Sequence, residues 1–440
     1  MDAGRADETA DADAGQAVLD ARALPTDHTA IDTILGGTSV PHVLWYQPDG
    51  TAIAGIDPIA VKEASGTNRF ATIRQWGQAV SQRIDYAGPA VARPRFLGGF
   101  SFFDEPTGSS PWSTFPAAWF MLPRVQVVAT NERSWLTTIG SSPHSEHHIT
   151  AGVERNGCRS KDAMPSIETI QPDPSKKGWI SQVKRVQSAI ARGHLRKAVL
   201  GHTSEATLSQ TASHAAIGSQ LEAGHKHCYR FVISPCGDTA FVGASPERLI
   251  EADGPRLETD ALAGSVARGD VPAADRAFAN TLQNSTKDAF EHEVVVDAIR
   301  DRLETYCETV ETGPRGIRRL ASVQHLHTPI EATRNDSHHM LDVASALHPT
   351  PAVGGLPRSA ALTTLREIET FDRGWYASPV GWFDTDGDGQ FAIGIRSAVV
   401  EEQTARLFAG AGIVAESDPD AEWDELQLKY QPIRGLFGDK

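Results

Sequence analysis

The chain has 440 residues, of which 40% are hydrophobic, and a formal net charge of −15 at pH 7. This acidity argues against nucleic acid as the main partner, because phosphate binding requires a basic surface. No apolar run reaches the roughly eighteen residues that a transmembrane helix needs, so we expect no membrane span.

The ends and the cysteines indicate the compartment. Residues 1–15, MDAGRADETADADAG, are acidic and small, and they lack the basic start and apolar middle of a signal peptide. Four cysteines (Cys158, Cys228, Cys236, Cys307) have no CxxC spacing, which favours a reduced cytoplasm. Lysine is scarce beside arginine and aspartate is plentiful, which is typical of a salt-rich, halophilic cytoplasm or simply of a GC-rich genome.

The first third of the chain predicts mainly strands. We expect residues 1–25 to form an acidic, mostly disordered tail that enters a first element near LDARAL. Residues 26–165 form an N-terminal portion in which residues 70–85 look helical. The predicted strands are HVLWYQ, AIAGI, RFLGGFSFF, AAWFMLPRVQVVAT and SWLTTIG. The polar, proline-bearing stretch 165–178, PSIETIQPDPSKKG, predicts a linker.

Residues 178–440 are expected to form the main core. Helical periodicity covers WISQVKRVQSAIARG, which ends at Gly193 as a natural cap, most of residues 273–307, and PRSAALTTLREIE. Strands are predicted at LRKAVLGHTSEATL, CYRFVISP, TAFVGASPERLIEA, VGWFD, QFAIGIRSAVVEE and TARLFAGAG, the last three in one antiparallel sheet. Helices and strands mix without strict alternation, so we predict an α+β fold with antiparallel sheets.

Two predicted helices carry paired carboxylates. Asp288 and Glu291 are spaced i, i+3, and so are Glu422 and Glu425, so each pair lies on one helical face. Two such faces could supply an oxygen-only site for a hard cation such as Mg²⁺, which binds one or two protein carboxylates and leaves room for a substrate oxyanion. Taken alone, each pair fits a solvated helix face better.

Three charged residues interrupt apolar surroundings. Lys197 lies among Ala, Val and Leu on a predicted strand, where burial would lower its pKa and make it a base. The alternative is a lysine at a strand end that reaches solvent. Glu247 follows a Ser-Pro turn and is either a general acid or a glutamate at a helix N-terminus. Arg396 inside a predicted strand requires a carboxylate partner, from the protein or from a ligand.

Glycines and acidic loops give weaker signals. Gly410 and Gly412 flank Ala411 in a predicted turn whose backbone N–H groups could bind a carboxylate. The stretch 384–390, DTDGDGQ, resembles the start of a calcium loop, but Ile395 stands where the twelfth-position glutamate should be, so a hairpin loop is favoured. HKHC at 225–228 lacks a second ligand pair at zinc spacing. No phosphate-binding loop or dinucleotide fingerprint is present.

Residues 180–437 contain nine short motifs in order: LRKAVLGH, GASPERL, ETDALAGSVARG, KDAFEH, VQHLHTPI, ALHPTPAVGGLPR, WYASPVGW, AIGIRSAVV and LFAGAGIVAESDPDAEWDELQLK. Together these motifs resemble those of the chorismate-utilising enzymes. The resemblance implies a fold like that of anthranilate synthase component I. In that fold two antiparallel sheets face each other in a sandwich, helices wrap around them, and the active site lies between them.

The resemblance also implies roles, and it is closest to isochorismate synthases of the menaquinone branch. It implies that Lys197 activates water, that Glu247 protonates the departing hydroxyl of chorismate, and that Glu291 and Glu425 hold Mg²⁺. Asp288 and Glu422 would support the metal. The substrate-binding residues it implies are Gly264, Ser265, His325, Ala352, Tyr376, Arg396, Gly410, Ala411, Gly412 and Lys429, with Ser265 in place of the usual threonine.

Three positions separate this chain from its siblings. Amine-using members resemble a pattern with glutamine at Lys197, or with a lysine where Ala263 stands, so water is the expected nucleophile and no glutaminase partner is expected. Salicylate synthases tend to have threonine at Ala352. A salicylate synthase, a siderophore-branch isochorismate synthase and an inactive relative acting as a scaffold remain the alternatives. We expect a monomer.

Overall fold

The structure, a computed structural model, describes residues 18–27, 40–140, 164–320 and 323–438. The expected tail therefore lies outside the described residues up to residue 17, and the first element is strand β1, which includes the LDARAL stretch. No helix in the described ranges is long and apolar enough to span a membrane. The described cysteines, Cys228, Cys236 and Cys307, are free thiols.

Helices and strands alternate irregularly along the chain. The helices are α2 (Arg69–Ser81), α4 (Lys176–Ala191), α5 (His214–Ala223), α6 (Pro272–Asn284), α7 (Thr286–Leu303), α8 (Met340–Leu347), α9 (Arg358–Ile368) and α10 (Pro419–Arg434). The strands are β1 (Leu19–Thr26), β2 (His42–Tyr46), β3 (Ala52–Ala64), β4 (Ile84–Ala87), β5 (Arg95–Phe100), β6 (Ala118–Ala129), β7 (Ser134–Gly140), β8 (Ile167–Asp173), β9 (Lys197–Leu208), β10 (Tyr229–Ser234), β11 (Thr239–Ser245), β12 (Arg248–Asp253), β13 (Arg256–Ala267), β14 (Cys307–Thr312), β15 (Gly316–Arg319), β16 (Val323–Arg334), β17 (Gly355–Leu356), β18 (Pro379–Asp384), β19 (Gly389–Ile393), β20 (Ser397–Glu401) and β21 (Thr404–Ile413).

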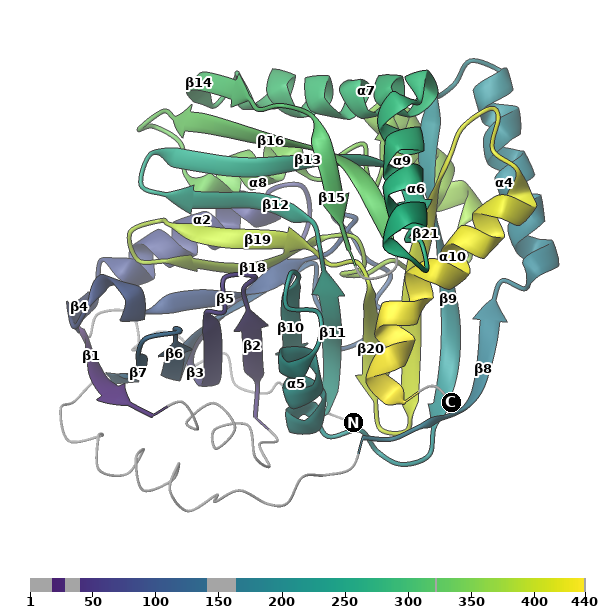
Figure 1. Ribbon diagram of the computed structural model, residues 1–440. Helices are drawn as coiled ribbons and strands as arrows, with labels where there is room; N and C mark the ends of the chain where they lie inside the picture. The colour runs from purple at the N-terminus through teal and green to yellow at the C-terminus, as the bar shows by residue number, and fades with distance from the viewer. Residues whose placement is uncertain (1–17, 28–39, 141–163, 321–322, 439–440) are drawn as a thin grey trace, which may run out of the picture.

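The strands form two sets that hydrogen bonds join into one folded sheet. One set runs β8-β9-β21-β20-β11-β10-β2-β3. The other runs β6-β5-β18-β19-β12-β13-β16. The long strands β3 and β6 pair with each other and connect the sets. In Figure 1 the second set runs across the view and the first set runs up it. Every pairing is antiparallel except that of β1 with β4.

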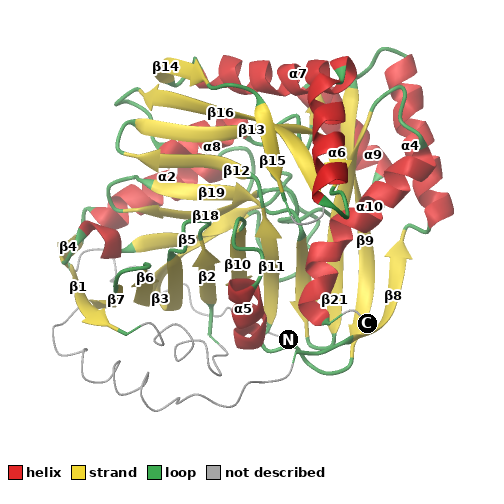
Figure 2. Cartoon of the chain, in the orientation of Figure 1, coloured by secondary structure: helices red, strands yellow, loops and turns green. Residues whose placement is uncertain are grey.

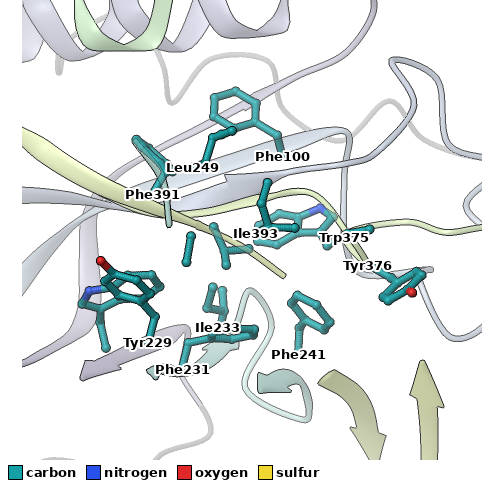
Figure 3. Close-up of a cluster of buried hydrophobic side chains, with 14 of the residues drawn as sticks. Phe100, Tyr229, Phe231, Ile233, Phe241, Leu249, Trp375, Tyr376, Phe391 and Ile393 are labelled. Carbon is teal, nitrogen blue, oxygen red and sulfur yellow. The ribbon is translucent and has the colours of Figure 1, made fainter. Parts of the chain in front are cut away.

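An aromatic core fills the space between the two sets. Figure 3 shows Phe231 of β10 and Phe241 of β11 facing Leu249 of β12 and Phe391 of β19. All four side chains are at most 1% exposed. The alternation of apolar residues along these strands places one face of each set against the other, which buries both faces. The expected sandwich of facing antiparallel sheets is therefore confirmed.

Helices cover the outer faces of the sandwich (Figure 2). Helix α7 packs on β13 and β16, α8 on β12, α5 on β10, and α10 on β21 and α4. The predicted helix 273–307 is two helices, because Ser285 ends α6 and then caps α7 by accepting a hydrogen bond from the Asp288 amide at 3.1 Å. This cap fixes the start of the helix that carries Asp288 and Glu291.

Three local predictions were wrong. The expected linker at 165–178 contains β8, which pairs with β9. The expected strand QFAIGIRSAVVEE is two strands, β19 and β20, which do not pair with each other and belong to different sets of the one folded sheet. The expected glycine turn at Gly410–Gly412 is the end of β21, paired with β9. In each case pairing with a distant strand decided the conformation.

Candidate active site

A cavity of about 250 Å³ lies where the two sets of strands meet. Every residue predicted for the site lines it except Ala411, whose side chain is fully buried on the other face of β21. The lining comes from strands β9, β13, β16 and β21, from helices α7 and α10, and from the connections β11–β12, α8–β17, α9–β18, β19–β20 and β21–α10. Residues far apart in the sequence, such as Lys197 and Lys429, therefore share one cavity.

Glu247 and Arg396 lie in two of the connections by which the chain passes from one set of strands to the other. Glu247 lies between β11 and β12, and Arg396 lies between β19 and β20. The two connections run side by side, because the amide of Ile393 donates to the carbonyl of Glu247 at 3.0 Å and the amide of Ala244 donates to the carbonyl of Arg396 at 3.1 Å. Arg396 has a φ of 52°, which is strained for a non-glycine residue and turns the chain sharply there.

Burial acts on Lys197 and Glu247 in opposite directions. Lys197 begins β9, and desolvation lowers the pKa of its ammonium group, although the negative charge of Glu291 opposes this shift. Glu247 is 7% exposed, and its pKa is raised to about 7 by desolvation and then by the charge of Asp260. The two shifts move the lysine toward its neutral form and the glutamic acid toward its protonated form, which is the direction that acid–base catalysis needs.

Asp260 lies behind Glu247 in a buried ionic network. It accepts a hydrogen bond from His327 at 2.7 Å and pairs with Arg248 and Arg318, each at 3.2 Å. Burial alone would raise the pKa of Asp260, but these partners hold it well below its ordinary value. Asp260 therefore stays negative and keeps the pKa of Glu247 high.

Removing the charge of Asp260 should move the titration of Glu247. In Asp260→Asn we expect the ionisation near pH 7 in the pH profile of kcat/KM to move to lower pH, because a nearby negative charge no longer opposes ionisation of Glu247. Glu258→Gln is the matched control, since it removes a carboxylate 2.7 Å from the same Arg248. An unchanged profile in Asp260→Asn, or an equal shift in both variants, would contradict this coupling.

The end of β21 presents two glycine amides to the cavity. Gly410 pairs with Gly201 and Gly412 with Val199, but the amides of Gly201 and Val199 donate elsewhere, to Glu369 and to the Gly354 carbonyl. The amides of Gly410 and Gly412 therefore point away from β9. Strand β20 covers β21 only as far as Phe408, so this edge is open at both glycines. These amides lie at an unpaired strand edge and not in a turn, and they are free to bind a carboxylate as the sequence predicts.

Glycine is required at 410 because the cavity wall comes too close for a side chain. An added Cβ at Gly410 would lie 2.7 Å from the hydroxyl oxygen of Tyr376. In Gly410→Ala we expect KM for the substrate to rise about tenfold, and stability to fall by about 1–3 kcal/mol, because the buried Tyr376 must move. Gly435→Ala is the control, since nothing lies within 4 Å of its added Cβ. Steady-state kinetics and chemical denaturation would test this, and equal behaviour of the two variants would contradict it.

A buried ion pair braces the strand that carries Lys197. Arg373 is 1% exposed and pairs with Glu369. Its guanidinium also donates to the carbonyls of Val199 at 2.5 Å and of Val353 at 3.0 Å, while Glu369 accepts the Gly201 amide. Because both charges are fully hydrogen-bonded, the pair can remain buried and hold β9 against the segment that contributes Val353 to the cavity.

The predicted metal carboxylates face the cavity from two helices. Asp288 and Glu291 come from α7, and Glu422 and Glu425 come from α10. Burial raises the pKa of Glu422, and the charge of Glu425 raises it further. Burial alone would raise the pKa of Glu425 as well, but Lys429, whose Nζ is 2.6 Å from Glu425, lowers it.

These side chains fit a hard divalent cation that keeps part of its water shell. The four carboxylates are half-buried, and the charge of Glu425 opposes ionisation of Glu422, so a cation would neutralise this repulsion. Among the described residues, no three His, Cys, Asp or Glu side chains are close enough to chelate one ion together. The site therefore lacks a complete protein cage, and a substrate carboxylate and water would have to supply the remaining ligands.

The opposite wall is polar but uncharged. Gly264 has a φ of 70° at a bulge in β13, which turns the strand next to Ser265. Ser265 Oγ lies 2.9 Å from Nδ1 of His325. Desolvation, helped by the charges of Arg396 and Lys429, lowers the pKa of His325 to about 3, so this histidine stays neutral.

Comparison with known proteins shows the family of the chain. The family model described as chorismate binding enzyme matches residues 19–438. The chain belongs to this family. Isochorismate synthase MenF of Bacillus subtilis is 35% identical over 354 residues, which cover 78% of this chain and 75% of that protein. The salicylate biosynthesis isochorismate synthase of Pseudomonas aeruginosa is 35% identical over 406 residues, covering 90% and 84%.

Solved structures agree with the family. MenF, the menaquinone-specific isochorismate synthase from Escherichia coli, aligns with a TM-score of 0.80 and 25% identity over 96% of this chain and 95% of that chain. Anthranilate synthase component I from Streptococcus pneumoniae aligns with a TM-score of 0.73 and 20% identity, covering 93% and 95%, and so supports the fold. The resemblance to isochorismate synthases and the expected fold class are both confirmed.

The sequence reasoning missed several lining residues of this chorismate-binding enzyme. Lys287, Ser417 and the apolar Val199, Val353 and Ile395 line the cavity but were not predicted for it. Lys287 precedes Asp288 by one residue, so its place beside the carboxylates could have been read from the motif. Ser417 hydrogen-bonds Glu422 and accepts from the Val414 amide at 3.1 Å, a contact without a signal in the sequence. The loop DTDGDGQ joins β18 to β19 as a hairpin, as expected.

Proposed function

We propose that this chain is an isochorismate synthase, which converts chorismate reversibly into isochorismate by adding water at C2 and releasing the C4 hydroxyl. Relatives that cover most of the chain are named isochorismate synthases. The single observation that carries the proposal is the pair Lys197 and Glu247, whose pKa values are shifted in opposite directions within one cavity.

Each member of the pair matches one half of the reaction. Water is a poor nucleophile, so a neutral lysine must accept its proton as it attacks C2. Hydroxide is a poor leaving group, so a protonated carboxyl must supply a proton as the bond at C4 breaks. We assign Lys197 to the first role and Glu247 to the second. The reverse reaction starts from the protonation states that the forward reaction leaves: the Glu247 carboxylate accepts a proton from water as it attacks C4, and the Lys197 ammonium group protonates the departing C2 hydroxyl.

The remaining lining positions the substrate's two carboxylates. We assign the pyruvyl carboxylate to Arg396, Tyr376 and the amides of Gly410 and Gly412, because all four line the cavity and Tyr376 lies beside Gly410 and close enough to Arg396 for their charges to interact. Gly264, Ser265, His325 and Ala352 would lie along the ring. Lys429 would complete the polar wall, since it already joins the Gly410 carbonyl at 2.7 Å and Glu425.

We assign the ring carboxylate to a Mg²⁺ ion held by Glu291 and Glu425, with Asp288 and Glu422 supporting it through water. When bound, the ion supplies positive charge that stabilises the charge developing on the ring carboxylate as the double bonds shift. The protein lines this part of the cavity with four carboxylates and holds Lys197 close enough to Glu291 for their charges to interact.

The proposal includes the setting of the enzyme. We propose a cytoplasmic monomer. We also propose that it works without a glutaminase subunit, because Lys197 activates water and the reaction does not need ammonia. The motifs HPTPAVGGLPR and WYASPVGW favour the menaquinone branch, and MenF proteins are among the relatives. Salicylate synthase is the second candidate, since it shares the lysine base and then eliminates pyruvate; Ala352 in place of threonine disfavours it.

Product analysis tests the proposal directly. The purified protein is incubated with chorismate and Mg²⁺, without ammonia, at low and at high salt, and products are identified by chromatography and mass. We expect an equilibrating mixture of chorismate and an isomer of equal mass. Salicylate plus pyruvate would move the assignment to the lyase sibling. Turnover only after ammonia is added would show that Lys197 is misassigned, and no turnover would support a binding role.

A further inference from the structure

A second cavity, of about 440 Å³, lies between α2, the end of α8 and the start of α9. It shares one chain segment with the catalytic cavity, because His348 and Pro349 line the second cavity while Ala352 and Val353 line the catalytic one. None of the residues assigned to chorismate lines it. Its function is therefore open.

The second cavity gathers positive charge with little to balance it. Arg69, Arg358 and Arg366 line it, and Arg302 lies close enough for its charge to lower the pKa of Arg358. Asp104 is the one carboxylate in its lining, and it pairs with Arg366 at 2.9 Å. This concentration of arginines stands in a chain whose net charge is −15.

Backbone carbonyls, and not carboxylates, meet the other three guanidinium groups. Arg358 donates to the carbonyls of Ala346 (3.0 Å) and His348, and Arg302 donates to those of Leu347 (3.0 Å) and Pro349 (3.3 Å). Arg69 donates to the carbonyls of Gly66 and Ser101. Within the described parts of the chain, none of these three arginines forms an ion pair with a carboxylate.

A charge balance shows what the second cavity lacks. Four guanidinium groups carry four positive charges and Asp104 carries one negative charge. The C-terminus of α8 contributes about half a negative charge, and the N-terminus of α9, which no side chain caps, contributes about half a positive charge. About three positive charges remain. Arg69 is buried, Arg302 and Arg358 are half-buried, and Arg366 is exposed. Because the first three charges are partly or wholly desolvated without a carboxylate partner, the excess favours a bound anion.

Buried polar atoms in the lining are also left without partners. Arg69 is 6% exposed and His348 is 2% exposed, yet Nε of Arg69 and Nδ1 of His348 have no hydrogen-bond partner. Desolvation, and then the charge of Arg69, keeps the pKa of His348 well below its ordinary value, so this ring is neutral. Its Nε2 donates to the carbonyl of Phe102 at 3.3 Å, so Nδ1 is an acceptor that needs water or a protonated oxygen, and Nε of Arg69 is the unpartnered donor that an anion can meet. Such atoms are costly to bury unless a ligand or water meets them.

We propose that this second cavity binds a small oxyanion, a phosphate or carboxylate group, held by Arg69, Arg358 and Arg366 and by the hydroxyls of Ser359 and Thr363. Because Arg358 also holds the His348 carbonyl, occupancy ties down the segment that leads to Ala352 and Val353. Binding is independent of the proposed function. We also expect occupancy of the second cavity to change the KM for chorismate, and this expectation rests on the proposed function.

The proposal is tested by calorimetry and thermal unfolding of the full chain. Sodium phosphate and sodium benzoate are the probes, and sodium chloride at equal ionic strength is the reference. We expect one site per chain and a midpoint of unfolding that rises with phosphate or with benzoate. Ser359→Glu places a carboxylate at the exposed start of α9, beside the arginines. It should raise the midpoint without added anion and weaken anion binding at least tenfold. Arg366→Gln should weaken binding similarly.

Ser188→Glu is the matched control, because it places the same charge in the other basic groove, formed by α4 and α9. This variant should bind the anion as the unaltered protein does. Binding of phosphate alone, or of benzoate alone, would support the proposal and identify the oxyanion. The absence of binding to either, or equal loss in Ser188→Glu and Ser359→Glu, would overturn it.

Discussion

Lys197→Ala should lower the rate of chorismate hydroxylation by a factor on the order of 10²–10⁴, the usual contribution of a positioned general base. The affinity for chorismate should change little, because Arg396, the glycine amides of β21 and the metal carboxylates remain. Single-turnover kinetics measures the chemical step, and calorimetry with chorismate and Mg²⁺ measures binding. The physical reason is that water cannot lose its proton to any other neutral base of comparable strength in the lining: His325 has its pKa lowered to about 3.

Two further variants separate a catalytic role from a packing role for Lys197. Lys184→Ala, at an exposed position on α4, is the matched control and should keep full activity. Lys197→Gln keeps most of the side-chain length, so the wall beside Gly412 is preserved, but it supplies no base. If Lys197→Gln turns over chorismate at the rate of the unaltered enzyme, Lys197 is not the base.

Glu425→Gln should raise the Mg²⁺ concentration for half-maximal activity by about tenfold to a hundredfold, the range typical of changes around a metal site. The substitution removes one negative charge from the cavity and leaves Lys429, 2.6 Å away, without its ion-pair partner. Mg²⁺ titrations of activity at saturating chorismate measure this shift. Activity should recover in part at high Mg²⁺, because Glu291 and the substrate carboxylate remain as ligands.

Asp424→Asn provides the control for Glu425. Asp424 is the preceding residue on α10, is exposed, and does not line the cavity. The substitution Asp424→Asn removes the same charge from the same turn of α10. It therefore separates the loss of a metal ligand from a general loss of negative potential near the cavity. A Glu425→Gln enzyme whose Mg²⁺ titration matches that of Asp424→Asn would remove Glu425 from the metal site.

Several features followed from the sequence because they depend on local patterns. The i, i+3 spacing placed Asp288 with Glu291, and Glu422 with Glu425, on one face of a helix before any fold was known. Alternating apolar residues predicted most strands, including the one that begins at Lys197. The ordered motifs identified the family and, with Lys197 and Ala263, the expected nucleophile. Helical spacing and strand alternation are short-range signals, and the order of the motifs can be read directly along the chain.

Only the tertiary structure decided how these pieces meet and which conformation each one takes. Gly410–Gly412 looks like a turn, but pairing with β9 makes it a strand whose open edge faces the cavity. The stretch around Arg396 looks like one strand, but the chain must pass from one set of strands to the other there, and it bends at a φ of 52°. The pKa values of Lys197 and Glu247 likewise depend on burial and on Glu291 and Asp260, which come from other elements. Burial and long-range pairing are properties of the folded chain as a whole, so no local stretch of sequence encodes them.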